Sequence, residues 1–183
     1  PRPGTTVEAL AALKTPFRPA GRVTAGNAAG LNDGATAALL ASEAKAIELG
    51  LGIKAKLVSF AFAGVEPEIM GYGPVPSTKK ALAKAGLKIE DIGLFEINEA
   101  FAIQVLSFLD HFGIADDDKR VNIYGGAIAV GHPLASSGIR LMLNLARGFE
   151  EHPEVRYGAT TMCIGLGMGG TVIWENPHFK GGK

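Results

Sequence analysis

The chain has 183 residues, of which 47% are hydrophobic and 20% charged, and its 18 basic and 18 acidic side chains balance to a formal net charge of zero. This balance argues against nucleic acid or an anionic membrane surface as a partner, because both are recognised through an excess of positive charge. The single cysteine excludes an internal disulfide and a metal site built from several cysteines, and no apolar run is long enough to span a bilayer.

The first half of the sequence predicts helices that alternate with strands. Pro16 stops a short amphipathic helix, Asn32 or Asp33 caps the next helix, and Gly50 ends it. Ser77 is expected to cap a third helix. The predicted elements are, in order, a helix over 7–14, a strand over 22–24, a helix over 35–49, a strand over 54–63 and a helix over 77–85.

The second half continues this alternation until its last two strands. Pro133 suits the first turn of a long helix, and the apolar residues after Asn98 recur at helical spacing. The predicted elements are a strand over 92–97, a helix opened by 98–101, a strand over 121–124, a helix over 134–149, and strands over 157–163 and 171–174. No helix separates the last two strands, so the sequence predicts a layered α/β fold with a mixed sheet.

Residues 165–170 read GLGMGG, which matches the G-x-G-x-x-G dinucleotide pattern by letter. That pattern binds pyrophosphate at the start of a following helix, inside a strand–helix–strand unit. Here the next residues, TVIW, favour a strand, and too few residues remain for a helix and a further strand. We therefore expect a hairpin that places Cys163 at a strand end beside exposed N–H groups, and no dinucleotide site.

Polar or ionisable side chains stand at the ends of apolar strands or in short loops before helices: Asn98, His132 and Cys163. Loops at the strand ends of a layered α/β fold converge on one crevice, so these residues can meet. Each also has a structural interpretation, since Asn98 and His132 can cap helices and Cys163 can be a small buried apolar residue. Together, a carboxamide, an imidazole and a thiol beside glycines favour an acyl-transfer or carbanion site.

At these residues the sequence resembles the thiolases, the acetyl-CoA acyltransferases. The segments NEAFA (98–102), GGAIAVGHPLASSGIR (125–140) and CIGLGMGG (163–170) occur in the family's order, and VTAGNAAGLNDGATAALL and MGYGPVPS upstream are also similar. The finer resemblance is to degradative 3-ketoacyl-CoA thiolases, such as the β-subunit of trifunctional fatty-acid-oxidation complexes. The resemblance implies a layered α-β-α-β-α fold with mixed sheets, in which 1–62 end the first domain and 63–183 form the second.

The resemblance implies thiolytic cleavage of a 3-ketoacyl-CoA by CoA, which gives acetyl-CoA and a shortened acyl-CoA. His132 would help to deprotonate a nucleophilic cysteine and donate to the thioester oxygen, and Asn98 would hold a water that completes this oxyanion hole. Cys163 would exchange a proton with the methyl carbon of acetyl-CoA, and the Gly165 N–H would contribute to a second oxyanion hole. CoA would be a co-substrate, with no permanently bound cofactor and no metal.

The resemblance assigns further residues to substrate binding. Met70 and Phe101 would line the channel for the acyl chain and for the pantetheine arm of CoA. Ala29 occupies the place at which the family often has a serine that contacts CoA. The hydrogen bond of that serine to CoA is therefore not expected here.

The family's nucleophilic cysteine lies in the first half of a chain about twice as long, whereas Cys163 is the only cysteine in this one. The chain by itself is therefore expected to be inactive, with the missing N-terminal half as its partner. The resemblance also implies a homodimer or tetramer that acts on acyl-CoA and CoA, and it admits a hydratase/dehydrogenase α-subunit as a further partner.

Other interpretations stay open. A biosynthetic acetyl-CoA acetyltransferase, or an inactive thiolase-like segment, would share the same motifs. Ketoacyl synthases use a related fold, but their cysteine lies in the first half of the chain, so Asn98 in NEAF and the late Cys163 argue against them. We expect a cytoplasmic protein, or a mitochondrial or peroxisomal one if the source is eukaryotic, and leave membrane association open.

Overall fold

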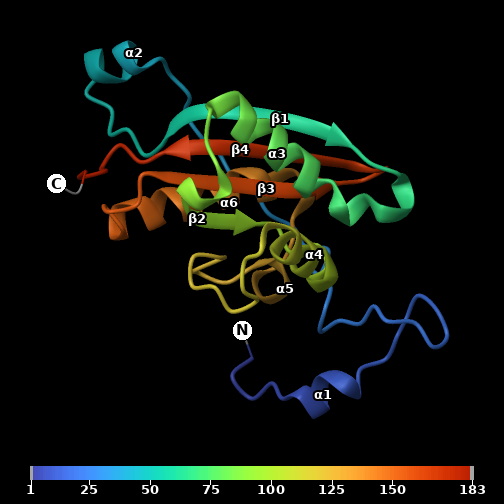
Figure 1. Cartoon of the computed structure of the whole chain (residues 1–183). Coiled ribbons are helices and arrows are strands. Elements are labelled where there is room, and N and C mark those ends of the chain that lie inside the picture. The colour runs from blue at the N-terminus through green and yellow to red at the C-terminus, as the bar shows by residue number, and fades with distance from the viewer. Residues whose placement is uncertain (1, 182–183) are drawn as a thin grey trace.

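The computed structural model describes residues 2–181 and centres on a four-stranded sheet (Figure 1). The strands lie in the order β1–β4–β3–β2. β2 and β3 are parallel, whereas β4 is antiparallel to both of its neighbours, so the predicted mixed sheet is confirmed. The bounds are Lys56–Gly64 for β1, Ile92–Ile97 for β2, Tyr157–Ile164 for β3 and Met168–Glu175 for β4.

Helices cover both faces of this sheet. Along β2, Leu94 packs in one hydrophobic cluster and its neighbour Phe95 in the other, because successive side chains of a strand point to opposite faces. α3 (Pro74–Ala85) and α4 (Ala102–Phe112) pack in the cluster of Phe95, and α6 (Leu134–Glu151) packs in that of Leu94. The larger core therefore lies between the sheet and the layer of α3 and α4.

Local sequence signals explain the ends of α3 and α4. Gly86 and Gly113 follow these helices with φ of 67° and 66°, the left-handed conformation that glycine adopts without strain. α3 begins at Pro74, because proline suits the first turn of a helix. Ser77, the predicted cap, is instead buried inside α3, and its hydroxyl lies 2.8 Å from the hydroxyl of Thr171 on β4.

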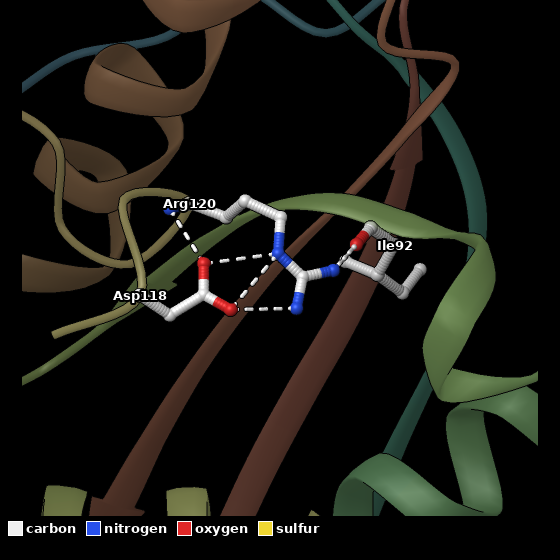
Figure 2. Close-up of polar contacts among 3 residues, drawn as sticks. All are labelled: Ile92, Asp118 and Arg120. Carbon is white, nitrogen blue, oxygen red and sulfur yellow. Dashed lines mark hydrogen bonds and ion pairs between the residues drawn. The ribbon is translucent and has the colours of Figure 1, made fainter. Parts of the chain in front are cut away.

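The segment between α4 and α5 (Ala127–Val130) is anchored along the outer edge of β2 (Figure 2). The Arg120 guanidinium donates to both carboxylate oxygens of Asp118 over 2.8 to 3.2 Å and to the Ile92 carbonyl over 3.1 Å. The Phe95 N–H donates to the Arg120 carbonyl over 2.8 Å. This anchor fixes the start of the loop that leads to α5.

The helix predicted over 35–49 is mostly absent. α2 covers only Glu43–Glu48, and its N-cap is Ser42. Leu39 is 79% exposed and Leu40 is 76% exposed, so most of the surface of these apolar side chains is left unpacked among residues 2–181. A short helix takes most of its stability from such packing, so helix propensity alone misled the prediction.

Two predicted strands are wrong. Residues 22–24 are irregular, because no strand of the described chain pairs with them. Over 121–124 the structure has a single bridge, between Val121 and Phe95. The next residue, Asn122, has φ of 49°, which turns the backbone out of the extended conformation and ends the pairing.

The remaining helices are short: α1 Val7–Ala11, η1 Pro67–Tyr72 and η2 Ile89–Asp91. α1 lies within the helix predicted over 7–14. Within residues 2–181, no helix combines the length and the apolar character that crossing a bilayer requires.

Candidate active site

Asn98 and Cys163 lie at the same edge of the sheet, where the parallel strands β2 and β3 end. Asn98 directly follows β2, and its backbone N–H donates to the Thr161 carbonyl of β3 over 2.9 Å. Cys163 is two residues beyond Thr161, and its pairing partner on β4 is Gly169. Parallel pairing therefore brings together two residues that are far apart in the sequence.

The Asn98 carboxamide contacts the His132 imidazole. Asn98 is fully buried, and its Nδ2 lies 3.2 Å from His132 Nε2. On the other side of the ring, His132 Nδ1 lies 2.7 Å from the Ser137 hydroxyl, which donates its one proton to the Pro133 carbonyl over 3.0 Å. Ser137 then accepts from Nδ1–H, and Nε2 accepts from Asn98. The network therefore holds a neutral imidazole whose basic nitrogen faces Asn98.

Electrostatics also favour the neutral form of His132. Burial and, to a smaller extent, the Arg140 guanidinium lower the pKa of the His132 imidazole below its usual 6.5. Arg140 Nη2 lies 3.5 Å from Asn98 Oδ1, so the carboxamide points its oxygen toward Arg140 and its N–H groups toward His132. An imidazole that is neutral at neutral pH can act as a general base.

A segment from the first part of the chain holds the His132 backbone. Asn32 Oδ1 accepts from the His132 N–H over 3.0 Å, and Leu31 forms a bridge with His132. Gly131 has φ of 96°, and a Cβ there would lie 2.6 Å from Asn32 Oδ1, so both conformation and space require glycine. The prediction that Asn32 caps a helix is wrong, because its side chain instead binds the loop that carries the imidazole.

Asn122 is a residue that the sequence interpretation missed. Its Oδ1 accepts from the Ile97 N–H over 2.8 Å, and its Nδ2 donates to the Ile97 carbonyl over 3.0 Å and to Glu99 Oε1 over 2.8 Å. Glu99 Oε2 in turn accepts from the Ile128 N–H over 3.1 Å. Asn122 thus fixes the residues on both sides of Asn98. The available signal is an asparagine inside a predicted strand, where that residue type is depleted.

Neither Asn98 nor His132 caps a helix. The N-cap residue of α4 is Phe101 and that of α6 is Pro133, and neither makes a side-chain capping bond. The helix predicted to open at Asn98 therefore begins only after Phe101, whose own backbone is still extended. The capping interpretation is wrong for both residues, and their contact with each other takes its place.

Cys163 stands apart from the Asn98–His132 pair in the hydrogen-bond network. Its side chain is 9% exposed, and Sγ donates to Gln104 Oε1 of α4 over 3.6 Å rather than to Asn98 or His132. Burial raises the pKa of the Cys163 thiol, and a backbone hydrogen bond offsets this effect only in part. The burial of Cys163 agrees with the interpretation as a small buried apolar residue. Its position near the end of β3 agrees with the interpretation as a residue of the acyl-transfer site.

A cavity of about 570 Å³ lies between η1 and the start of α4. Met70 and Phe101, the two residues predicted to form a channel, both line it. Gln104 lines the same cavity and contacts Cys163. The structure therefore places the predicted channel next to the thiol.

Ala29 and Gly165 border the site from two separate loops. The Ala29 N–H donates to the Ala100 carbonyl over 3.0 Å, which places Ala29 beside Phe101 of the cavity wall. Gly165 is exposed in the turn that joins β3 to β4, two residues after Cys163. Within residues 2–181, no group of three or more His, Cys, Asp and Glu side chains is placed to hold a metal ion.

Two protein-family models match the sequence. The model described as thiolase, C-terminal domain, matches residues 51–176, and the model described as thiolase, N-terminal domain, matches residues 1–44. The division of the chain into 1–62 and 63–183 stays a prediction.

Known proteins are similar to this chain over nearly its whole length. It is 54% identical over 176 residues to a 3-ketoacyl-CoA thiolase of Pseudoalteromonas translucida, and the aligned region covers 95% of this chain and 45% of the relative. It is also 54% identical over 178 residues to a 3-ketoacyl-CoA thiolase of Aliivibrio fischeri, with coverages of 96% and 46%. The chain therefore spans less than half the length of these curated relatives.

Solved structures agree with the predicted fold. The crystal structure of human mitochondrial 3-ketoacyl-CoA thiolase matches with a TM-score of 0.89 and 41% identity, over 96% of this chain and 44% of that one. The Bacillus anthracis acetyl-CoA acetyltransferase matches with the same TM-score, 42% identity and the same coverages. The predicted fold is confirmed, and the chain belongs to the thiolase family.

Proposed function

We propose that this chain is the C-terminal part of a 3-ketoacyl-CoA thiolase, which uses CoA to cleave 3-ketoacyl-CoA into acetyl-CoA and a shortened acyl-CoA in fatty-acid β-oxidation. The observation that carries the proposal is the 3.2 Å contact between Asn98 Nδ2 and His132 Nε2, at the strand edge that also bears Cys163. Similar proteins named 3-ketoacyl-CoA thiolase support the choice of substrate.

In the first half of the reaction His132 acts as a base. Its neutral Nε2 takes the proton of a nucleophilic cysteine, which we place outside these 183 residues because Cys163 is the only cysteine among them. The resulting thiolate attacks the C3 carbonyl of the substrate, and the Gly165 N–H stabilises the oxyanion that forms. The protonated His132 and a water held by Asn98 then face the thioester oxygen.

Breaking the C2–C3 bond leaves its electron pair on C2 as the enolate of acetyl-CoA, with its negative charge on the thioester oxygen. His132 Nε2–H and the water on Asn98 stabilise that oxygen, and the Cys163 S–H gives its proton to C2. The raised pKa of the buried Cys163 thiol keeps that proton in place until the carbanion forms. The acetyl-CoA product leaves, and the shortened acyl group stays on the nucleophilic cysteine.

In the second half of the reaction CoA gives its thiol proton to the Cys163 thiolate. The CoA thiolate attacks the acyl-enzyme and the shortened acyl-CoA forms. The nucleophilic cysteine leaves as a thiolate and takes its proton back from His132, which restores the starting state. Met70 and Phe101 guide the acyl chain and the pantetheine arm along the cavity of about 570 Å³, and Ala29 borders the path of CoA. CoA is thus a co-substrate, and the scheme uses no permanently bound cofactor.

The proposal extends to the assembly in which the chain works. The N-terminal thiolase half supplies the nucleophilic cysteine, and the complete protein forms a homodimer or tetramer, as the family resemblance implies. A hydratase/dehydrogenase α-subunit is a further proposed partner, and the cytoplasm is the proposed location, or the mitochondrion or peroxisome of a eukaryotic cell.

A second candidate is the biosynthetic acetyl-CoA acetyltransferase. The observation that favours it is the match to the Bacillus anthracis acetyl-CoA acetyltransferase, whose TM-score of 0.89 equals that of the human 3-ketoacyl-CoA thiolase. The two candidates differ in the length of the acyl chain that the cavity must accept. Comparing turnover of acetoacetyl-CoA with that of long-chain 3-ketoacyl-CoA substrates separates them.

The proposed chemistry is tested by following the loss of 3-ketoacyl-CoA in the presence of CoA. In the complete enzyme, His132→Ala is expected to lower kcat by roughly 10²- to 10⁴-fold, because it removes the general base. His178→Ala, at an exposed histidine near the C-terminal end, is the matched control and should leave kcat unchanged.

Two outcomes would contradict the assignment of roles. The first is full activity of His132→Ala in the complete enzyme. The second is turnover by the 183-residue chain alone, since the scheme requires a second cysteine that this chain does not contain.

A further inference from the structure

Gln104 on α4 is a buried polar residue to which the chemistry above gives no role. It is 2% exposed, and its Oε1 accepts from Cys163 Sγ over 3.6 Å. Its Nε2 is buried and has no hydrogen-bond partner among residues 2–181. A buried donor without a partner is uncommon in native structures and calls for an explanation.

The Gln104 carboxamide can present either of its ends to the sulfur. The terminal torsion of glutamine is broad and roughly two-fold, so half a turn exchanges Oε1 and Nε2. Because Nε2 has no partner, this rotation breaks only the hydrogen bond to Cys163. A thiol donates to Oε1, whereas a thiolate repels Oε1 and accepts from Nε2–H.

In the part of the chain that the structure describes, no charged side chain compensates a thiolate at Cys163. Burial raises the pKa of Cys163, a backbone hydrogen bond lowers it by less, and no ionisable side chain contributes to the shift. The ionisable groups on the elements packed around β3 in the described chain are Glu68 and Tyr72 of η1, Lys79, Lys80 and Lys84 of α3, Glu96 of β2, Asp110 and His111 of α4, Arg140, Arg147, Glu150 and Glu151 of α6, Glu175 of β4, and the nearby His132. Gln104 is the neighbour whose amide N–H can donate a hydrogen bond to the thiolate.

We propose that Gln104 is a positioning residue whose carboxamide turns with the charge state of Cys163, accepting from the thiol through Oε1 and donating to the thiolate through Nε2. The step that creates the thiolate rests on the proposed function, in which the Cys163 proton passes to C2 of the departing acetyl-CoA and the CoA thiol later returns one. A bond from an N–H to a thiolate is charge-assisted and stronger than the weak bond from an S–H. Gln104 therefore makes the thiolate easier to form than burial alone would allow.

The test is the pH dependence of Cys163 alkylation by iodoacetamide, followed by mass spectrometry of the peptide that contains this cysteine. Gln104→Met keeps the length of the side chain but removes the donor. It should raise the pH at which the alkylation rate is half-maximal, the midpoint, by about one unit, so alkylation below the midpoint slows about tenfold. Gln104→Glu should raise the midpoint further, because a carboxylate repels the thiolate. Ser107→Ala, on the same helix and in the same cavity wall, should leave it unchanged.

The pH midpoint of Cys163 alkylation distinguishes a Gln104 that donates to the thiolate from one that only fills space beside it. Loosened packing would expose the thiol to water, so it would speed alkylation and lower the midpoint, whereas loss of the Gln104 donor raises the midpoint. A midpoint in Gln104→Met that equals or lies below that of the unaltered protein would overturn the proposal. The titration needs no substrate, so a failed thiolysis assay would count against the proposed function and leave this measurement intact.

Discussion

Glu96 lies on β2 two residues before Asn98, and its carboxyl is buried at 2% exposure. Burial raises the pKa of Glu96 to about 7, and the opposing effects of the Asn144 amide, 3.0 Å away, and of Arg140 are smaller. In the unfolded chain the same carboxyl ionises near its ordinary value of 4.5. As pH rises from there through 7, the folded state holds the proton that the unfolded state has lost, so stability falls across this window.

Glu96→Gln is therefore expected to stabilise the protein on the alkaline side of that window. The free energy of unfolding should increase by about 2 kcal/mol at about pH 8 and change little at about pH 5, because the neutral amide avoids the cost of a buried charge. Urea unfolding at both pH values measures the effect. Glu90→Gln, at an exposed carboxylate, is the control and should change stability by less than about 0.5 kcal/mol. A loss of stability in Glu96→Gln at the higher pH would show that attraction to Arg140 outweighs burial.

At the scale of single residues, the sequence predicted contacts between residues that stand at the ends of strands or just before helices. Asn98 and His132 each stand next to a recognisable element end, so their meeting could be predicted from the way strand ends converge. The contacts of Gln104 and Asn122 could not, because they depend on which face of α4 and which turn of a loop reach the site in three dimensions. Gln104 carries no local pattern of its own, and the one signal at Asn122, an asparagine inside a predicted strand, does not identify its partners.

The start of α3 and the hairpin of β3 and β4 meet through bare backbone. A Cβ on Gly169 would overlap the Gly73 carbonyl group, and a Cβ on Gly73 would overlap the Met168 carbonyl. Neither obstacle is a flexible side chain, so neither can move aside. Glycine is needed at both positions for space rather than for backbone conformation, since neither has a positive φ.

Gly169→Ala is expected to destabilise the protein by about 3 kcal/mol, because the added methyl group forces β4 away from α3. Thermal unfolding, followed by circular dichroism, measures the loss. Gly138→Ala on α6 is the matched control, because a Cβ there meets nothing within 4 Å, and it should stabilise the helix by roughly 0.5 kcal/mol. Equal melting temperatures for the two variants would contradict the role of the backbone contact.

Elements were predictable where their residues are buried within this chain. The strand over 92–97 has its predicted bounds, because its apolar side chains fill both core clusters. The hairpin after Cys163 also formed as predicted, since glycine and TVIW leave no alternative to a turn and a strand. The helix over 35–49 failed for the opposite reason, because Leu39 and Leu40 are exposed and propensity had no packing to support it.

On the scale of the molecule, residues 2–54 lie largely outside the sheet and its helix layers. Their first part, with α1, extends away from the sheet (Figure 1), whereas Ala28, Leu31 and Asn32 contact the loops of the site. Several large apolar side chains of residues 2–54 are exposed: Val7, Phe17, Leu31, Leu39, Leu40 and Ile47. Few buried contacts hold such a segment, so it should open locally at low free-energy cost.

Limited trypsin digestion is expected to cut this segment first and to leave the sheet and its helices as a resistant product. The exposed basic residues of the segment that no proline follows, and that trypsin can therefore use, are Lys14, Arg22, Lys45 and Lys54. Lys79 and Lys80 are exposed as well, but α3 holds them in a packed helix, which should protect them from early cleavage. Mass spectrometry of the first products decides the matter, and early cuts in α3 would contradict this view of the molecule.

The glycine contact at the start of α3 also limits how the acyl-chain selectivity of the proposed function can be re-engineered. η1 carries Met70 and joins α3 at Gly73, while Gly169 pairs with Cys163, so the pocket wall and the thiol belong to one rigid unit. If η1 moved outward to enlarge the cavity for a bulkier substrate in the proposed function, the Cys163 thiol would be displaced as well. In the proposed function, extra volume has to come from shortening the Met70 or Ile69 side chain in the cavity wall, and the expected result is an altered chain-length preference with the Cys163 thiol left in place.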